Sequence, residues 1–189
     1  MDFGARWGKF MAMRYILLLA LWPFSLQAQE YTAPRELGCV PHTELRADMT
    51  PPELARIVRA CVNAEAHENA FAVWLSFNSY ALYDQQRVKD ESAHMVLQDL
   101  YSWTFSGYPR DVMDDLKLAA DLYRDASGEA FLKACEVIVA TGRPDYRPTY
   151  MIATGMWPLK NPDDWRTDPF DGDAAWRNAV SDINGCPEF

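Results

Sequence analysis

The chain has 189 residues, of which 49% are hydrophobic and 24% are charged, and its formal net charge is −9 at pH 7. A chain this acidic is a poor candidate for binding nucleic acid or an anionic membrane, because its long-range field repels both. The length fits one domain with a sizeable core.

The first 28 residues have the order of a secretory signal peptide. A positive region with Arg6, Lys9 and Arg14 precedes the apolar run 15–22, and the signal closes at Ala28. The apolar run is too short to span a bilayer. We therefore expect cleavage after Ala28 and an exported, soluble, periplasmic protein that does not insert into the membrane.

The start of translation is open between Met1, Met11 and Met13, because a later start gives a more compact signal. Cleavage leaves 29–189 as a single helical domain with 15 bases and 26 acids, hence a net charge of −11. Such a domain suits a partner with a basic surface.

Four cysteines lie in the mature part of the chain, at Cys39, Cys61, Cys135 and Cys186. An even number in an exported protein predicts two disulfides. We favour Cys39–Cys61 and Cys135–Cys186, since each ties an irregular terminal segment to a nearby helix. Three pairings are possible, and the main alternative joins Cys61 to Cys135 and Cys39 to Cys186.

The first helix is predicted to start at Thr50-Pro51-Pro52-Glu53, which combines a cap, a proline in the first turn and a capping-box glutamate. One apolar face follows at helical spacing. A second helix, about 67–83, is apolar nearly all round, which indicates a central helix wrapped by the others.

Three further helices follow in the next sixty residues. One starts near Asp90 and ends before the Gly107-Tyr108-Pro109 stop signal. Another starts at about Arg110 with acids in its first turn, where the helix dipole favours them. The last is expected to have Ser127 as its cap and to end at Gly142.

Residues 143–172 are rich in proline and aromatic residues, which predicts an ordered loop region. A short helix from Ala174 to Asn184 should follow an aspartate cap. The only strand candidate is Thr149 to Ala153. We therefore predict an all-α fold, a compact bundle of five to six helices in antiparallel hairpins, with a tetratricopeptide-like texture in the first hairpin but no second copy of that repeat.

The polar stretch YDQQRVKDESAH, residues 83–94, is interpreted as the corner between two helices, with Asp90 as a cap. A buried version would have Arg87 bridge Asp84 or Asp90. The chemical alternative is a metal site at Glu91 and His94, whose spacing puts them on one helical face. A second such pair is missing from the sequence, so we expect no metal and no cofactor.

No nucleophile elbow, phosphate loop or dinucleotide fingerprint occurs in the sequence. The segment DPFDGD, residues 168–173, has some features of a calcium loop, but it departs from the calcium-binding order and fits a capped turn better. We therefore predict a protein that binds rather than an enzyme.

Aromatic side chains among acids near the C-terminus form the candidate partner-binding surface. Aromatic anchors with a charged rim are typical of protein interfaces. The alternative is that the rings only cover the end of the bundle. The predicted partner-binding residues are Trp157, Trp165, Asp168, Phe170 and Asp171.

The export signal, the size, the helical hairpin and the stretch YDQQRVKDESAH together resemble periplasmic immunity proteins of type VI secretion effectors, in particular those that guard against phospholipases. The resemblance spans roughly residues 39–140 and transfers no functional residue. It implies one-to-one binding that neutralises a cognate toxin effector. The alternative is a periplasmic helical-hairpin adaptor that binds a peptide or an envelope protein, and a hydrolase of unknown type comes third.

Overall fold

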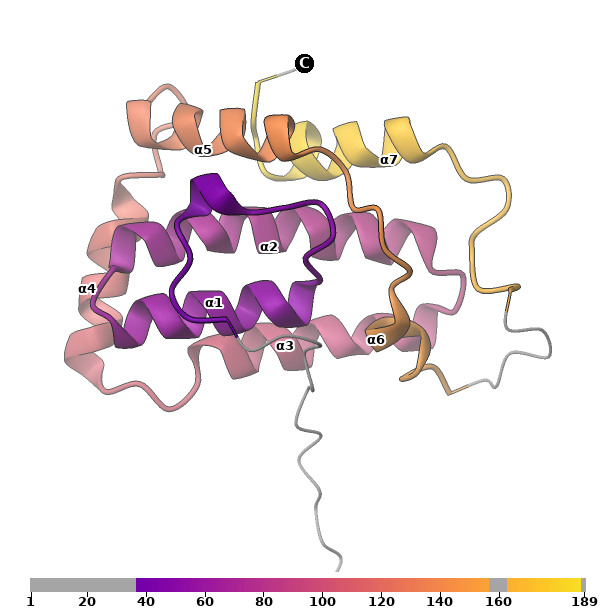
Figure 1. Cartoon of the computed structure of the whole chain (residues 1–189), viewed down its shortest axis with the longest axis horizontal. Helices are drawn as coiled ribbons and strands as arrows, with labels where there is room; N and C mark the ends of the chain where they lie inside the picture. Colours follow the sequence, from indigo (N-terminus) through magenta and orange to yellow (C-terminus); the bar gives the residue numbers. More distant parts are fainter. Residues whose placement is uncertain (1–36, 157–162, 188–189) are drawn as a thin grey trace, which may run out of the picture. The chain divides into compact units, whose positions relative to one another are not determined.

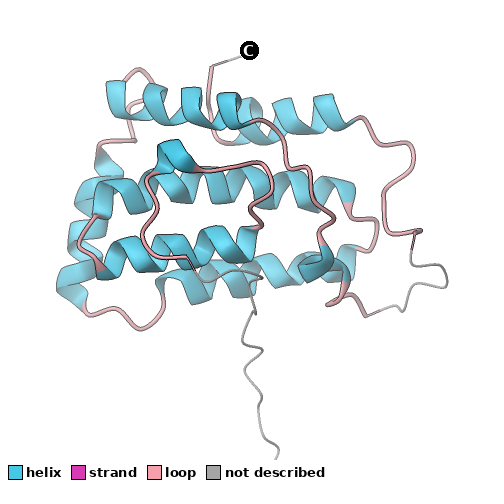
Figure 2. Cartoon of the chain, viewed as in Figure 1, coloured by secondary structure: helices cyan, strands magenta, loops and turns pink. Residues whose placement is uncertain are grey.

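A computed structural model describes residues 37–156 and 163–187, and these residues are helical with no strand among them (Figures 1 and 2). This confirms the all-α prediction. The α-helices are α1 (Pro51–Asn63), α2 (His67–Arg87), α3 (Met95–Phe105), α4 (Arg110–Asp121), α5 (Glu129–Thr141), α6 (Thr149–Ile152) and α7 (Gly172–Arg177). Short turns of other helix types are η1 (His42–Glu44), η2 (Glu91–His94) and η3 (Asn178–Ile183).

Helix α1 begins at the predicted capping box. The Thr50 amide and hydroxyl donate to one oxygen of Glu53, at 2.8 and 2.9 Å, and the Glu53 side chain is buried with them. The helix then buries the predicted apolar face, which consists of Leu54, Ile57, Val58, Cys61 and Val62. The capping box and the buried apolar face both favour a helix here, so local sequence and tertiary packing agree on α1.

Helix α2 is the central element of the described unit. It contacts α1, α4, α5, α7 and η3, and Figure 1 shows α1 on one side of it and α5 and α7 on the other. Its buried side chains include Val73 and Phe77 on one face and Ser79 and Tyr83 on a different face. This is the arrangement expected for a helix that is apolar nearly all round.

Both predicted disulfides are present, Cys39–Cys61 and Cys135–Cys186. The first ties the segment before α1 to α1 itself, and the second ties the segment after η3 to α5. Disulfides of this kind stabilise a small domain chiefly by restricting its unfolded chain. They are compatible with an oxidising compartment outside the cytoplasm.

Three local predictions are wrong. Helix α2 continues past Tyr83 to Arg87. Ser127 does not cap α5, because Gly128 stands at the cap and the Ser127 hydroxyl instead donates to Asp125. The strand candidate at Thr149 begins helix α6, in which backbone bonds return to Pro148.

The predicted signal peptide, residues 1–28, lies outside the described residues. Within the described ranges, no helix is long and apolar enough to cross a membrane. The described residues form one compact unit, and the sites discussed below all belong to it.

Gly155 is a point at which the packing tolerates no side chain. A Cβ atom there would lie 2.3 Å from an Asp90 carboxylate oxygen. The Asp90 side chain is fixed, because its other oxygen accepts bonds from the Ser92 amide and hydroxyl. The contact therefore leaves little room for relaxation.

We expect Gly155→Ala to lower the free energy of unfolding by about 1–3 kcal/mol, the usual range for overpacking. Gly38→Ala is the matched control, since a Cβ at Gly38 meets nothing within 4 Å, and it should change stability by less than about 0.5 kcal/mol. Urea denaturation followed by circular dichroism measures both. Equal stability of the two variants would contradict the expectation.

Candidate functional site

Residues 88–94 of the polar stretch form the predicted corner between α2 and α3, while residues 83–87 belong to α2 and contain a buried ion pair. The Arg87 Nε atom donates to Asp84 Oδ1 at 2.8 Å, and Nη2 lies 2.6 Å from the same oxygen. The Asp84 side chain is 0% exposed and that of Arg87 is 4% exposed. Of the two partners considered for Arg87, the structure selects Asp84, while Asp90 accepts from Ser92 as a cap.

Two tyrosine hydroxyls complete the environment of the buried carboxylate. Tyr146 and Tyr150 each donate to Asp84 Oδ2 at 3.0 Å. Burial raises the pKa of the Asp84 carboxyl to about 6, although the guanidinium and the two hydroxyls act in the opposite direction. Burial and the nearby carboxylate raise the pKa of both tyrosines well above the ordinary value, so their hydroxyls stay protonated and donate.

The segment 165–167 is held beside the end of α2 by backbone hydrogen bonds. The Lys89 amide donates to the Trp165 carbonyl at 2.9 Å, and the Thr167 amide donates to the Arg87 carbonyl at 3.0 Å. Val88 and Arg166 thereby form an isolated antiparallel bridge. This pairing brings residues nearly eighty positions apart into one site.

A cavity of about 590 Å³ opens beside this corner, and we call it the arginine pocket. Four guanidinium groups and four aromatic rings dominate its lining. The lining consists of Tyr83, Arg87, Arg143, Pro144, Asp145, Tyr146, Arg147, Trp165, Arg166, Phe170 and Gly172. A chain with a net charge of −9 thus gathers cations around one cavity.

Guanidinium groups and rings alternate in the wall of the arginine pocket. The Arg87 guanidinium lies 5.0 Å from the Tyr83 ring centre and 5.1 Å from that of Tyr146. The Arg166 guanidinium lies 4.9 Å from the Trp165 ring centre and 5.9 Å from that of Phe170. Such cation–π contacts hold an arginine in place without neutralising its charge.

The arginines of the pocket differ in their acidic partners. Arg143 pairs with Asp173, and both side chains are at least half exposed. Arg147 lies 3.9 Å from Asp163, another exposed pair. Arg166 has no carboxylate partner among residues 37–156 and 163–187. Exposed pairs contribute little to stability, so an incoming anion can compete with them.

The predicted partner-binding residues fall into three groups. Trp165 and Phe170 line the arginine pocket and are half-buried. Asp168 and Asp171 are exposed on the same segment but do not line the pocket, and Asp171 caps α7 by accepting from the amides of Asp173 and Ala174. Trp157 lies outside the described residues. The role of the set in partner binding stays a prediction.

The sequence analysis did not predict that the arginines of the pocket lie together. Arg143, Arg147 and Arg166 stand one at a time among prolines, acids and aromatic residues, so no run of basic residues marks them. The only local signal was Arg87 in the polar corner. Their convergence depends on how the segments 143–147 and 165–170 fold back onto α2.

The Glu91–His94 pair is not arranged as a metal site. These residues form the short turn η2 and not a turn of α-helix. The Nε2 atom of His94 lies 2.8 Å from the Val88 carbonyl oxygen and bonds to it, which ties the corner together. The described residues contain no group of three or more histidine, cysteine, aspartate or glutamate side chains suited to a metal ion.

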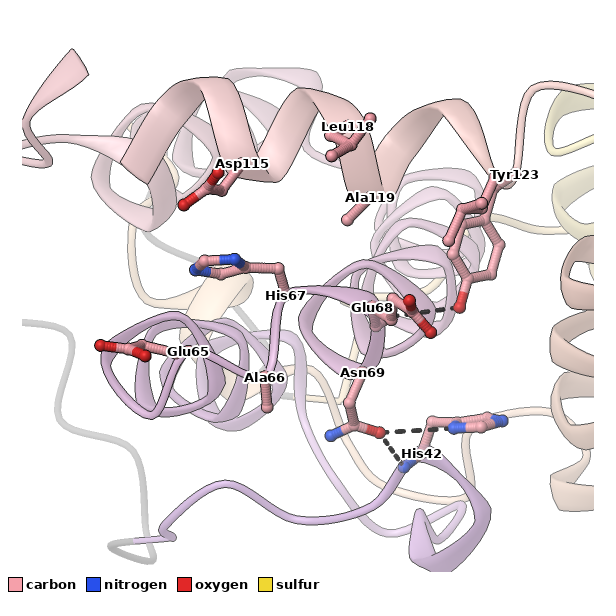
Figure 3. A pocket seen from close by; sticks show the side chains of 11 residues that line it. His42, Glu65, Ala66, His67, Glu68, Asn69, Asp115, Leu118, Ala119 and Tyr123 are labelled. Atoms are coloured by element: carbon pink, nitrogen blue, oxygen red, sulfur yellow. Dashed lines mark hydrogen bonds between the residues drawn. The ribbon is translucent and has the colours of Figure 1, made fainter. Parts of the chain in front are cut away.

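A second cavity, of about 850 Å³, lies between the start of α2 and helix α4, and we call it the α4 pocket (Figure 3). Asp115 on α4 points across it toward His67, and Glu65 and Glu68 lie on the opposite side. Leu118 of α4 is 69% exposed at its edge. The α4 pocket is therefore acidic with apolar parts, in contrast to the arginine pocket.

Asparagine and tyrosine side chains fix the walls of the α4 pocket. Asn69 accepts from the His42 amide at 2.9 Å and donates to the Val40 carbonyl at 2.9 Å. The Tyr123 hydroxyl donates to the Glu68 carbonyl at 3.1 Å. Glu65 has a positive φ of 59° at the tight turn between α1 and α2, a conformation that non-glycine residues rarely adopt.

Comparison of this chain with known protein families, with curated proteins and with solved structures finds no match.

The raised pKa of Asp84 predicts a specific pH dependence of stability. A carboxyl whose pKa is higher in the folded protein than in the unfolded chain holds its proton more tightly in the folded state, and this difference stabilises the fold at low pH. The stabilisation from Asp84 is fully present below about pH 4 and is lost as the pH rises through about 6. The free energy of unfolding of the wild type minus that of Asp84→Asn should fall by on the order of 2 kcal/mol from pH 4.5 to 7.5.

Asp114→Asn is the control, because Asp114 is an exposed carboxylate paired with Lys117 on α4. Its difference from the wild type should vary little over the same pH range. Chemical denaturation at a series of pH values measures both differences. A wild-type minus Asp84→Asn difference that stays constant with pH would contradict the assignment.

Proposed function

We propose that this protein is a periplasmic immunity protein, which binds a cognate secreted toxin effector one-to-one and so neutralises it. The proposal rests on the resemblance of this chain to such proteins in its export signal, its size and its helical hairpin. It also fits the two disulfides, which suit a protein that works outside the cytoplasm. A phospholipase is the toxin class that the resemblance favours.

The observation that supports binding most directly is the wall of the arginine pocket. Tryptophan, tyrosine and arginine are the residues that contribute most to the free energy of protein interfaces. Here Trp165, Tyr146 and three exposed arginines line one open cavity. The buried Asp84 network holds that wall in place before any partner arrives, which lowers the entropy lost on binding.

Charge supports the same proposal from outside the pocket. Asp168 and Asp171 are exposed on the segment that also carries Trp165 and Phe170. In an acidic chain these carboxylates would speed association with a toxin that presents a basic face. We therefore propose that basic side chains of the toxin meet Asp168 and Asp171, and that its acidic side chains face the mouth of the arginine pocket.

The α4 pocket supports a second candidate, a periplasmic adaptor. Its acidic side chains, together with Leu118 and Leu122, which are 69% and 48% exposed, suit a basic amphipathic peptide. An adaptor of this kind would bind its peptide at α4, far along the chain from the segment 163–171. The two candidates therefore differ in which variants impair binding.

The test of the immunity function is co-production in the periplasm with the toxin effector encoded beside this gene. We expect growth to be restored and the two purified proteins to co-elute at a one-to-one ratio in size-exclusion chromatography with light scattering. A gene that lies in an envelope-assembly operon, or a toxin that remains lethal, would favour the adaptor.

The contact surface is tested separately with two matched charge reversals. Asp168→Lys should weaken toxin binding by about tenfold or more, because it places a cation against a basic face. Asp114→Lys changes the net charge equally at an exposed position of α4 and should leave the affinity within about twofold. Equal effects in surface plasmon resonance would remove the segment 163–171 from the contact but leave neutralisation itself standing.

A further inference from the structure

Arginines converge on the arginine pocket from three separate segments of the chain. Arg87 ends α2, Arg143 and Arg147 follow α5, and Arg166 lies in the segment that pairs with 87–89. Surface arginines that serve only solubility are interspersed with acids and spread over a surface. Three exposed arginines and the buried Arg87 surround one cavity, and Asp145 is the one carboxylate among its described lining residues.

Arg87 lies at the buried end of this site, where it is paired with the Asp84 carboxylate. Its side chain is 4% exposed. Its Nη2 atom is buried and lies 2.6 Å from Asp84 Oδ1 in the ion pair, and it donates no hydrogen bond that meets geometric criteria among the described residues. Three rings, those of Tyr83, Tyr146 and Trp165, lie within 6 Å of the guanidinium and hold it in place.

Gly172 lets the wall of the pocket close around Arg143. A Cβ atom at position 172 would lie 3.0 Å from Arg143 Nη1 and 3.2 Å from the Tyr83 hydroxyl oxygen. The missing side chain therefore allows a guanidinium to approach the aromatic wall. The carboxylate that pairs with Arg143 is Asp173, whose side chain is exposed.

We propose that the arginine pocket is an oxyanion-binding site, which takes a carboxylate or phosphate group between Arg143, Arg147 and Arg166. Arginine suits this ligand because its planar fork donates two parallel hydrogen bonds to two oxygens. The rings of Trp165 and Phe170 lie 4.9 and 5.9 Å from the Arg166 guanidinium and hold it in place without neutralising its charge. Phosphate and carboxylate share this chemistry, so the site accepts either group.

The source of the oxyanion is either a free small molecule or an acidic side chain of a partner. Only the second source rests on the immunity function proposed above. The binding site itself stands on the pocket alone. A failure to neutralise a toxin would therefore not contradict oxyanion binding. A failure to bind an oxyanion would not contradict toxin neutralisation.

The experiment titrates the full mature protein with inorganic phosphate and with capped triglutamate, at constant ionic strength and pH 7.5. Isothermal titration calorimetry gives the affinity, and capped triglutamine serves as the neutral probe. We expect saturable one-to-one binding of at least one anion and none of triglutamine. Tighter binding of phosphate indicates a free anion as the natural ligand, and tighter binding of triglutamate indicates a partner side chain.

Variants at the pocket mouth separate this site from general charge attraction. Arg166→Gln and Arg143→Gln should each weaken anion binding about tenfold, a difference of about 1.4 kcal/mol. Arg124→Gln removes the same charge from an exposed pair with Asp121 and should leave binding within about twofold. Arg166→Lys keeps the charge but loses the fork, so it should not restore the affinity.

Gly172→Ala tests the geometry without any change in charge. It should weaken anion binding severalfold through displacement of Arg143, while circular dichroism at room temperature stays unchanged. The proposal is overturned if neither anion binds at millimolar concentration, or if Arg124→Gln weakens binding as much as Arg166→Gln does.

Discussion

A carboxylate that water cannot reach lies at the end of the central helix, and donors from three segments satisfy it. Asp84 accepts from Arg87 within α2, from Tyr146 after α5 and from Tyr150 in α6. Removal of a charge from water carries a large penalty, so a buried carboxylate requires its partners in place. This requirement fixes where the C-terminal third of the chain folds back onto α2.

The same requirement shapes the arginine pocket. The tyrosines that reach Asp84 bring their neighbours Arg143 and Arg147 to the surface above it, and the pairing of 165–167 with 87–89 adds Trp165 and Arg166. The buried pair is thus the floor of a cavity whose mouth is cationic. The buried pair therefore stabilises the corner and also holds the wall of the cavity that we propose to bind an oxyanion.

The α4 pocket differs from the arginine pocket in charge, because acids and not arginines line it. Helix α4 buries only Leu116 and Ala119, and Leu118 lies exposed near Glu65, Glu68 and Asp115 in the lining of the α4 pocket. The described part of the chain therefore has one cavity lined mainly by arginines and another lined by acids. A partner that engaged both would have to be matched in charge at two places, and such matching is how interfaces gain specificity.

The sequence by itself determined the elements whose signals are local. The capping box at Thr50 and the stop at Gly142 follow from short-range patterns, and the favoured disulfide pairing follows from chain proximity; all are present. An aspartate cap before the last helix was also expected, although the helix begins at Gly172 with Asp171 as its cap, and not at Ala174. It also identified Trp165 and Phe170 as members of one cluster. Only the tertiary structure decided that arginines surround them, that α2 continues to Arg87, and that a strand-like segment becomes α6. These outcomes depend on the buried Asp84, whose partners lie some sixty residues further along the chain, and periodicity carries no information about contacts at that separation.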